Sequence, residues 1–189
     1  MDTLLKRIFI IVTVLGVVSQ FGCGHYDNGE PPLNKAVIVL STALASGATD
    51  QIGSVDVVIE LPAGVTVQSD PSSGAISNGI NGVLRLSGEA ARFASQPNAV
   101  TPVIMGKYTP ATSTNKANVA LSMIVQPNNS SGLNPGEFAT LECDRSPDVH
   151  DTSIFRLTSV LIANILGTKI YDSTTGSGPA SATINVSLL

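Results

Sequence analysis

The sequence predicts an all-β fold, and three observations lead to that class. From residue 35 to the C-terminus, apolar and polar residues alternate with a period of two, which is the pattern of half-buried strands. The segments between them are rich in turn-forming residues, and the chain has 17 Gly and 11 Pro in 189 residues. Segments with helical periodicity are scarce. Together these features predict a β-sandwich or β-barrel of about nine strands.

The first half of this region contains the clearest alternation. In "SVDVVIEL" (54–61), Val55, Val57 and Ile59 fall on one face and are expected in the core. The pair Asn81–Gly82, directly before an apolar run, predicts a tight turn because both residues tolerate positive φ. The strands expected here cover residues 35–42, 54–61, 65–68, 83–87 and 101–108.

The second half continues the pattern to the last residue. In "SATINVSLL" (181–189), Ala182, Ile184, Val186 and Leu188 are expected to face inward. A chain that ends inside such a pattern indicates that the final strand is held in a sheet. The remaining expected elements are a helix of one or two turns at residues 88–95 and strands at residues 115–126, 137–144, 153–164 and 181–189.

The N-terminal residues have the three parts of an export signal. Lys6 and Arg7 supply positive charge, Ile8–Val18 is apolar, and small residues follow. The apolar stretch is shorter than the about 20 residues that a helix needs to span a bilayer. Residues 1–22 are therefore predicted to be a cleaved signal peptide rather than a transmembrane helix.

Cys23 directly follows this segment, and two cleavage sites are consistent with the sequence. The four residues ending at Cys23 resemble the lipobox of bacterial lipoproteins, in which the Cys becomes the first mature residue and carries acyl chains. Gly22 fits that pattern, whereas Gln20 and Phe21 depart from it. Cleavage by an ordinary signal peptidase after Ser19 is the alternative, and it would leave Cys23 as a thiol.

The segment behind Cys23 favours the lipid anchor. Its sequence, "GHYDNGEPPLN", is polar, rich in Gly and Pro, and unpatterned, as expected of a spacer between a membrane and a folded domain. We therefore predict a flexible tether over residues 23–34 and one folded domain over residues 35–189. Gly24, rather than Asp, after the Cys resembles the sorting pattern of outer-membrane lipoproteins. A secreted or periplasmic protein is the alternative.

Charge and residue inventory argue against two classes of function. The formal net charge is −4 and no run of Lys or Arg occurs, so nucleic acid is not an expected partner. The histidines are His25, in the tether, and His150, and no Gly-x-Ser-x-Gly elbow occurs. Catalysis is therefore not expected.

The densest polar cluster is "CDRSPDVHDTS" (143–153). Asp144, Asp148 and Asp151 supply the oxygen ligands that Ca²⁺ prefers, so a calcium site is one interpretation. The other is a solvated turn whose Asp side chains accept local hydrogen bonds. The spacing matches neither an EF-hand nor a zinc motif.

Cys143 falls at an inward position of its expected strand. A free Cys commonly behaves as a small buried apolar residue, and that is the first interpretation. If Cys23 keeps its thiol, a disulfide between Cys23 and Cys143 is the alternative in an oxidising compartment.

Four stretches carry a family resemblance. "GSVDVVIELPAGVTVQS" is like a second strand with its Pro-x-Gly-Val turn, "GLNPGEFATLECD" resembles a Gly-rich step into a strand, "SVLIANILGTKI" a penultimate region and "ATINVSLL" a closing strand. On these residues the domain resembles the cohesin-like branch of the cohesin and carbohydrate-binding β-sandwich superfamily. The resemblance implies an antiparallel jelly-roll sandwich. It also implies a protein partner, since cohesins bind dockerin modules through a strand face, or a polysaccharide, for which Tyr108 is the candidate stacking residue.

The sequence thus predicts a non-catalytic binding or assembly module, tethered to the cell envelope through lipidated Cys23. A protein is the expected partner, and a cell-surface or extracellular polysaccharide is the alternative. No cofactor is expected beyond the candidate Ca²⁺.

Overall fold

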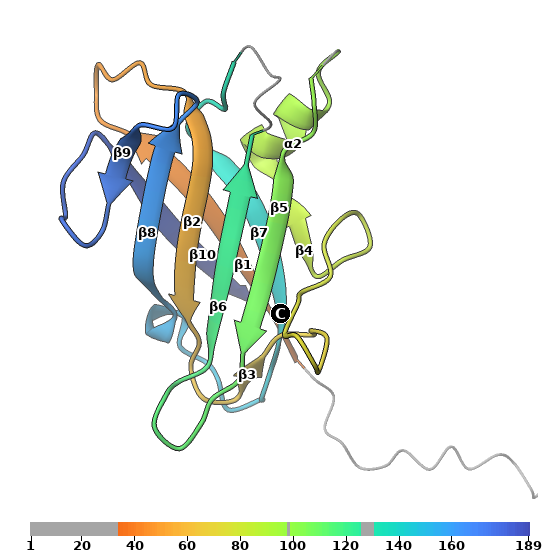
Figure 1. The fold of residues 1–189 in the computed structure, drawn as a ribbon. Coiled ribbons are helices and arrows are strands. Elements are labelled where there is room, and N and C mark those ends of the chain that lie inside the picture. Colours follow the sequence, from red (N-terminus) through yellow and green to blue (C-terminus); the bar gives the residue numbers. More distant parts are fainter. Residues whose placement is uncertain (1–33, 98, 126–130) are drawn as a thin grey trace, which may run out of the picture. The chain divides into compact units, whose positions relative to one another are not determined.

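The computed structural model describes residues 34–97, 99–125 and 131–189, and in this part ten strands are arranged in two sheets (Figure 1). A short helix, α2 (Gly88–Ala94), and a 3-10 turn, η1 (Thr152–Ile154), complete the regular structure. The strands are β1 (Asn34–Leu44), β2 (Ile52–Glu60), β3 (Val65–Thr66), β4 (Leu84–Leu86), β5 (Val103–Thr109), β6 (Asn118–Ile124), β7 (Glu137–Arg145), β8 (Arg156–Asn164), β9 (Lys169–Asp172) and β10 (Ala180–Leu188).

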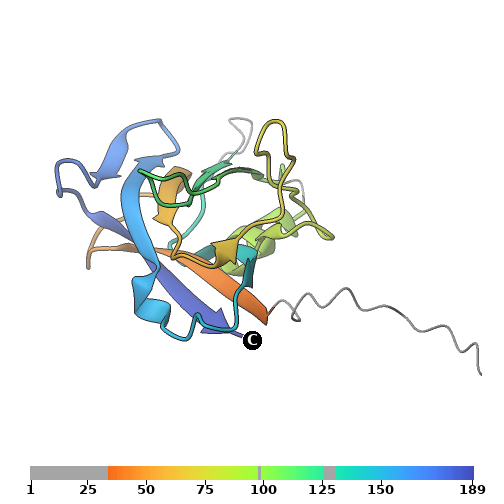
Figure 2. The same ribbon diagram turned by 90° about the horizontal axis from the view of Figure 1, so that it is seen from below.

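The strands form two layers that pack face to face. One sheet has the order β10-β1-β7-β3, with β4 also paired to β7, and the other has the order β5-β6-β2-β8-β9. All strand pairs are antiparallel. Figure 2 looks between the two layers from below. The prediction of an all-β sandwich is confirmed.

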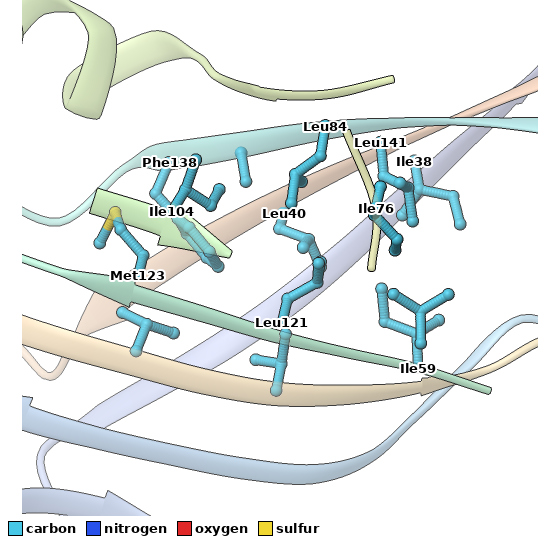
Figure 3. Packing of buried hydrophobic residues seen from close by; sticks show 14 of the residues in the cluster. Ile38, Leu40, Ile59, Ile76, Leu84, Ile104, Leu121, Met123, Phe138 and Leu141 are labelled. Atoms are coloured by element: carbon cyan, nitrogen blue, oxygen red, sulfur yellow. The ribbon is translucent and has the colours of Figure 1, made fainter. Parts of the chain in front are cut away.

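The core lies between the layers and follows from the alternation in the sequence. Val55, Val57 and Ile59 are each 2% exposed or less, as their alternation predicts. Figure 3 shows Leu141 of β7 facing the same interior as Leu121 of β6. Burial of one such aliphatic side chain contributes about 1.5–3 kcal/mol relative to leaving it in water.

The structure differs from the predicted strand set at two places. The prediction of about nine strands missed β9, which pairs with Leu161–Ala163 of β8. Its four residues are too few for alternation to show. The stretch predicted as one strand from residue 153 begins instead with η1. The Asp151 side chain accepts a hydrogen bond from the Ser153 N–H at 2.8 Å, which stabilises this turn, and the strand starts only at Arg156.

The two ends of the described domain meet in one sheet. Lys35 and Leu189 exchange two backbone hydrogen bonds, of 3.3 and 2.8 Å, at the point where β1 begins and β10 ends. The predicted signal peptide, Cys23 and most of the predicted tether lie outside the described residues. Within the described part, no helix has the length and hydropathy needed to cross a membrane.

Candidate functional site

Exposed apolar side chains gather around β5, at one edge of the β5-β6-β2-β8-β9 sheet. Eight large hydrophobic residues of the described chain are exposed, and five of them belong to this region. We call these five the β5 patch: Ile80, Val100, Val103, Met105 and Ile124. Ile80 is 93% exposed and Met105 is 50% exposed. Such a gathering of apolar surface marks an interaction site more often than a scattered set does.

Strand geometry brings members of the patch together. β5 alternates, so that Ile104 and Tyr108 are buried while Val103 and Met105 point to the opposite, outer face. Val103 lies directly opposite Ile124 of β6, and side chains at opposed positions of an antiparallel pair contact each other. Val103, Ile124 and Met105 therefore form an exposed apolar row on the outer face of the β5–β6 pair.

A groove of about 680 Å³ adjoins this row, between α2, the turn around Ile80 and the start of β5. Ala91 and Ala94 of α2 line it, and their small side chains leave room for an inserted group. The turn is fixed in place because the Asn78 side-chain amide donates to the Ile104 carbonyl oxygen at 2.6 Å. The lining of the groove is mostly apolar, which suits an aliphatic or aromatic side chain.

The outer face of the sheet is hollowed beside Met105. This shallow hollow, of about 320 Å³, is lined in part by the small residues Gly106, Ala120, Ser122 and Ser159. Short side chains on neighbouring strands leave a depression that a protruding side chain can occupy. The groove and the hollow thus flank the exposed row on β5.

The electrostatics of this surface are weak. Arg85 is the one charged residue that lines the groove, and it forms an ion pair with Glu142. Two charged residues of opposite sign, Asp56 and Lys107, line the hollow. The surface therefore favours recognition by shape and apolar contact over attraction of a highly charged ligand.

The three predicted calcium ligands have different structural roles. Asp144 lies on β7 and accepts a hydrogen bond from Lys35 Nζ at 2.5 Å, Asp148 is exposed in the following turn, and Asp151 begins η1. Hydrogen bonding by Ser153 lowers the pKa of Asp151. Among the described residues no three Asp, Glu, His or Cys side chains form a group able to hold a metal. The calcium site stays a prediction that no ligand cluster supports.

Cys143 and Tyr108 both face the interior. Cys143 is a free thiol, 1% exposed, and burial raises its pKa to about 12. Its predicted disulfide partner, Cys23, lies outside the described residues. Tyr108 is 9% exposed, and its ring belongs to the core while also lining a loop groove of about 470 Å³ near β3. Tyr108 therefore does not present an open ring face on which a sugar could stack.

The β5 patch was not predicted from the sequence. The signal was present in "VIMGKY", where apolar residues occupy both phases of the alternation. A strand that is apolar on both faces is ordinarily buried on both sides, but β5 is at the edge of its sheet and one face of it is open.

Comparison with known proteins gives no match: no family model, curated protein or solved structure proved similar to the chain. The geometry of the chain itself is therefore the basis for a functional proposal.

Proposed function

We propose that this protein is a non-catalytic binding module that recognises a protein partner through the β5 patch. The observation that carries the proposal is the concentration around β5 of five of the eight exposed large hydrophobic residues of the described chain. The centres of protein interfaces are apolar and depleted of charge, and the five residues of the β5 patch are apolar. The partner inserts an aliphatic or aromatic side chain into the groove beside α2.

The sandwich belongs, in this proposal, to the cohesin-like jelly-roll type. Two features support it: every strand pair is antiparallel, and the chain passes repeatedly from one sheet to the other. In that type a sheet face binds the partner, and Val103, Met105 and Ile124 of the patch lie on such a face beside the hollow.

Site-specific photo-cross-linking tests the binding surface directly. A photoreactive residue replaces Met105 in the full chain, in cells that natively make it, and Leu166 is replaced in a matched control. Leu166 is 86% exposed but lies between β8 and β9, away from the patch. We expect a defined protein adduct at position 105 and none at position 166. Equal adducts at both positions, or none at 105, would contradict the proposal.

Tethering at the cell envelope through lipidated Cys23 completes the proposed function. The Gly-Cys pair behind an apolar segment and the polar spacer after it support this step. The intact mass of the mature protein tests it. We expect a species that starts at Cys23 with acyl chains attached, whereas one starting at Gln20 with no acyl chain would contradict the anchor and leave the binding proposal intact.

A polysaccharide is the second candidate ligand, and one observation favours it. Tyr108 lines the loop groove near β3 together with Thr112, Ser113, Thr114 and Asn115, whose polar side chains suit a sugar. A glycan array probed with the full chain tests this candidate. Binding that Asn115→Ala weakens would support it, and an array without any binding would remove it.

A further inference from the structure

Three of the four sheet edges are covered by irregular segments of the chain. At β5, the Ile76 N–H donates to the Gly106 carbonyl at 2.9 Å. β9 is bridged by Ser177, and β4 by Asn78. β3, which also borders β7, has only two residues. Bridges of this kind prevent an edge from pairing with another chain.

The fourth edge, β10, is different. In the described residues its backbone bonds only to β1, although β8, β9 and η1 all contact it. Lys35 and Leu189 form a hydrogen-bonded pair, in which each backbone N–H donates to the other residue's oxygen. In an antiparallel ladder such pairs alternate, so Ser187, Asn185, Thr183 and Ser181 of β10 also bond to β1. The N–H and C=O groups of the alternate set point away from β1 and face the open edge: Ala182, Ile184, Val186 and Leu188.

β10 also lacks the features that normally block an open edge. Its sequence, "ASATINVSL", contains no charge and no Pro, and its register with β1 shows no bulge. Long, flat, uncharged edge strands are the ones that pair with a further strand. The inner face of β10 is only half-buried, so its apolar side chains gain burial when another strand is added.

We propose that β10 pairs with β10 of a second copy of this chain, antiparallel about a two-fold axis at Asn185. In this register Ile184 lies opposite Val186 of the second copy, and Ala182 opposite Leu188. These are the residues whose backbone groups face the edge, so each pair exchanges two hydrogen bonds. Apolar residues meet on the inner face, and Asn185 meets its own counterpart on the outer face.

The strand favours a second copy because its pattern is self-complementary. Two-fold pairing places the same residues on both sides, so a charged strand would repel itself, and β10 carries no charge. Thr183 lies opposite Ser187 of the second copy, which adds a polar pair on the outer face. A strand pair is a small interface, and small interfaces are weak and transient, so the dimer forms in a concentration-dependent manner.

Position-specific disulfide formation tests the register. Asn185→Cys is placed in the full chain, purified in mild detergent, with Cys23→Ser so that the buried Cys143 is the only other cysteine. The two Asn185 positions form a non-hydrogen-bonded pair about 4.5 Å apart between Cα atoms, within the range of a disulfide. Ser181→Cys is the matched control, because Ser181 is also exposed on β10 but lies roughly 26 Å from its counterpart in this register. We expect at least ten times more covalent dimer for Asn185→Cys.

Sedimentation of the chain without introduced cysteines provides the second measurement. We expect the dimer fraction to rise with concentration, and Asn185→Lys to raise the dimer dissociation constant at least tenfold by placing two like charges opposite each other. Ser181→Lys is the control and leaves it unchanged. Equal cross-linking at both positions, or a chain that stays monomeric at every concentration, would overturn the proposal. Neither measurement involves the β5 patch, so the proposed function is tested separately.

Discussion

At the scale of single residues, burial determines the chemistry of Cys143. The thiol lies on the inner face of β7 and its pKa is raised to about 12 by burial. Because the thiolate is the reactive form, we predict that iodoacetamide at pH 8 labels Cys143 only after denaturation. Mass spectrometry of the Cys143 peptide measures this without interference from Cys23. Labelling of the native protein at the denatured rate would contradict the buried placement.

The same pKa predicts a pH dependence of stability. The ordinary pKa of a Cys thiol in an unfolded chain is about 8.5, so the unfolded state loses this proton first as pH rises. The free energy of unfolding should therefore fall as pH rises from about 9 towards the folded-state pKa of about 12. Urea unfolding across this range measures it. Cys143→Ala should make the fall shallower, and an unchanged slope would show that other groups cause it.

Arg145 joins segments that are distant in the sequence. Its guanidinium donates to the carbonyl oxygens of Lys35 at 3.2 Å, Val149 at 3.0 Å and Leu189 at 3.1 Å. Hydrogen bonds from a charged group contribute more than neutral ones, so Arg145→Met should lower the free energy of unfolding by about 1–3 kcal/mol. Arg156→Met, at an exposed position that starts β8, should change it by less than about 0.5 kcal/mol. Equal effects in urea unfolding would contradict the assigned role.

At the scale of the elements, the packing of β5 depends on a residue without a side chain. A Cβ atom on Gly106 would lie 2.8 Å from a Leu121 methyl, 2.9 Å from one of Leu84 and 3.0 Å from one of Ile76. Overfilling a packed core costs about 1–3 kcal/mol, and we predict that loss of unfolding free energy for Gly106→Ala. Thr109→Ala, at an exposed position on the same strand, is the control. Equal melting temperatures of the two variants would contradict this prediction and show that the core accommodates the added methyl group.

How far the elements could be predicted depended on their length and on where they lie. Long strands with one buried face were predicted well, because a period of two assigns each residue to a face without tertiary information. β10 shows the limit of that pattern: the inward phase of Ile184 is confirmed, but its half-burial follows from the edge position, which no local pattern reveals. β9 and η1 are too short to have a period.

The candidate site was missed for a related reason. Val103 and Met105 have the residue types of a core, and only the order of the strands shows that their face is open. Strand order is set by pairings between residues far apart in the chain, such as Val103 with Ile124. The carboxylates of residues 144–151, by contrast, were conspicuous in the sequence, and the structure assigns two of them to an ion pair and to the start of η1.

At the scale of the whole molecule, two surfaces are left open for association. The β5 patch lies at one edge of the β5-β6-β2-β8-β9 sheet, and β10 forms one edge of the other five-stranded sheet. A protein with this arrangement can hold a different partner and a second copy of itself at the same time. If the Cys23 anchor confines it to a membrane, the raised local concentration would favour the weak strand pairing.

The central claim is tested most directly by the affinity of patch variants for the partner that cross-linking identifies, purified as a free protein. Met105→Asp places a charge in the β5 patch, at a position that is exposed and so tolerates it, and Leu166→Asp is the control outside the patch. We predict by calorimetry that Met105→Asp weakens binding at least tenfold, about 1.4 kcal/mol, while Leu166→Asp binds like the native chain. Native affinity for Met105→Asp, or an equal loss in both variants, would contradict the claim that the β5 patch is the binding surface.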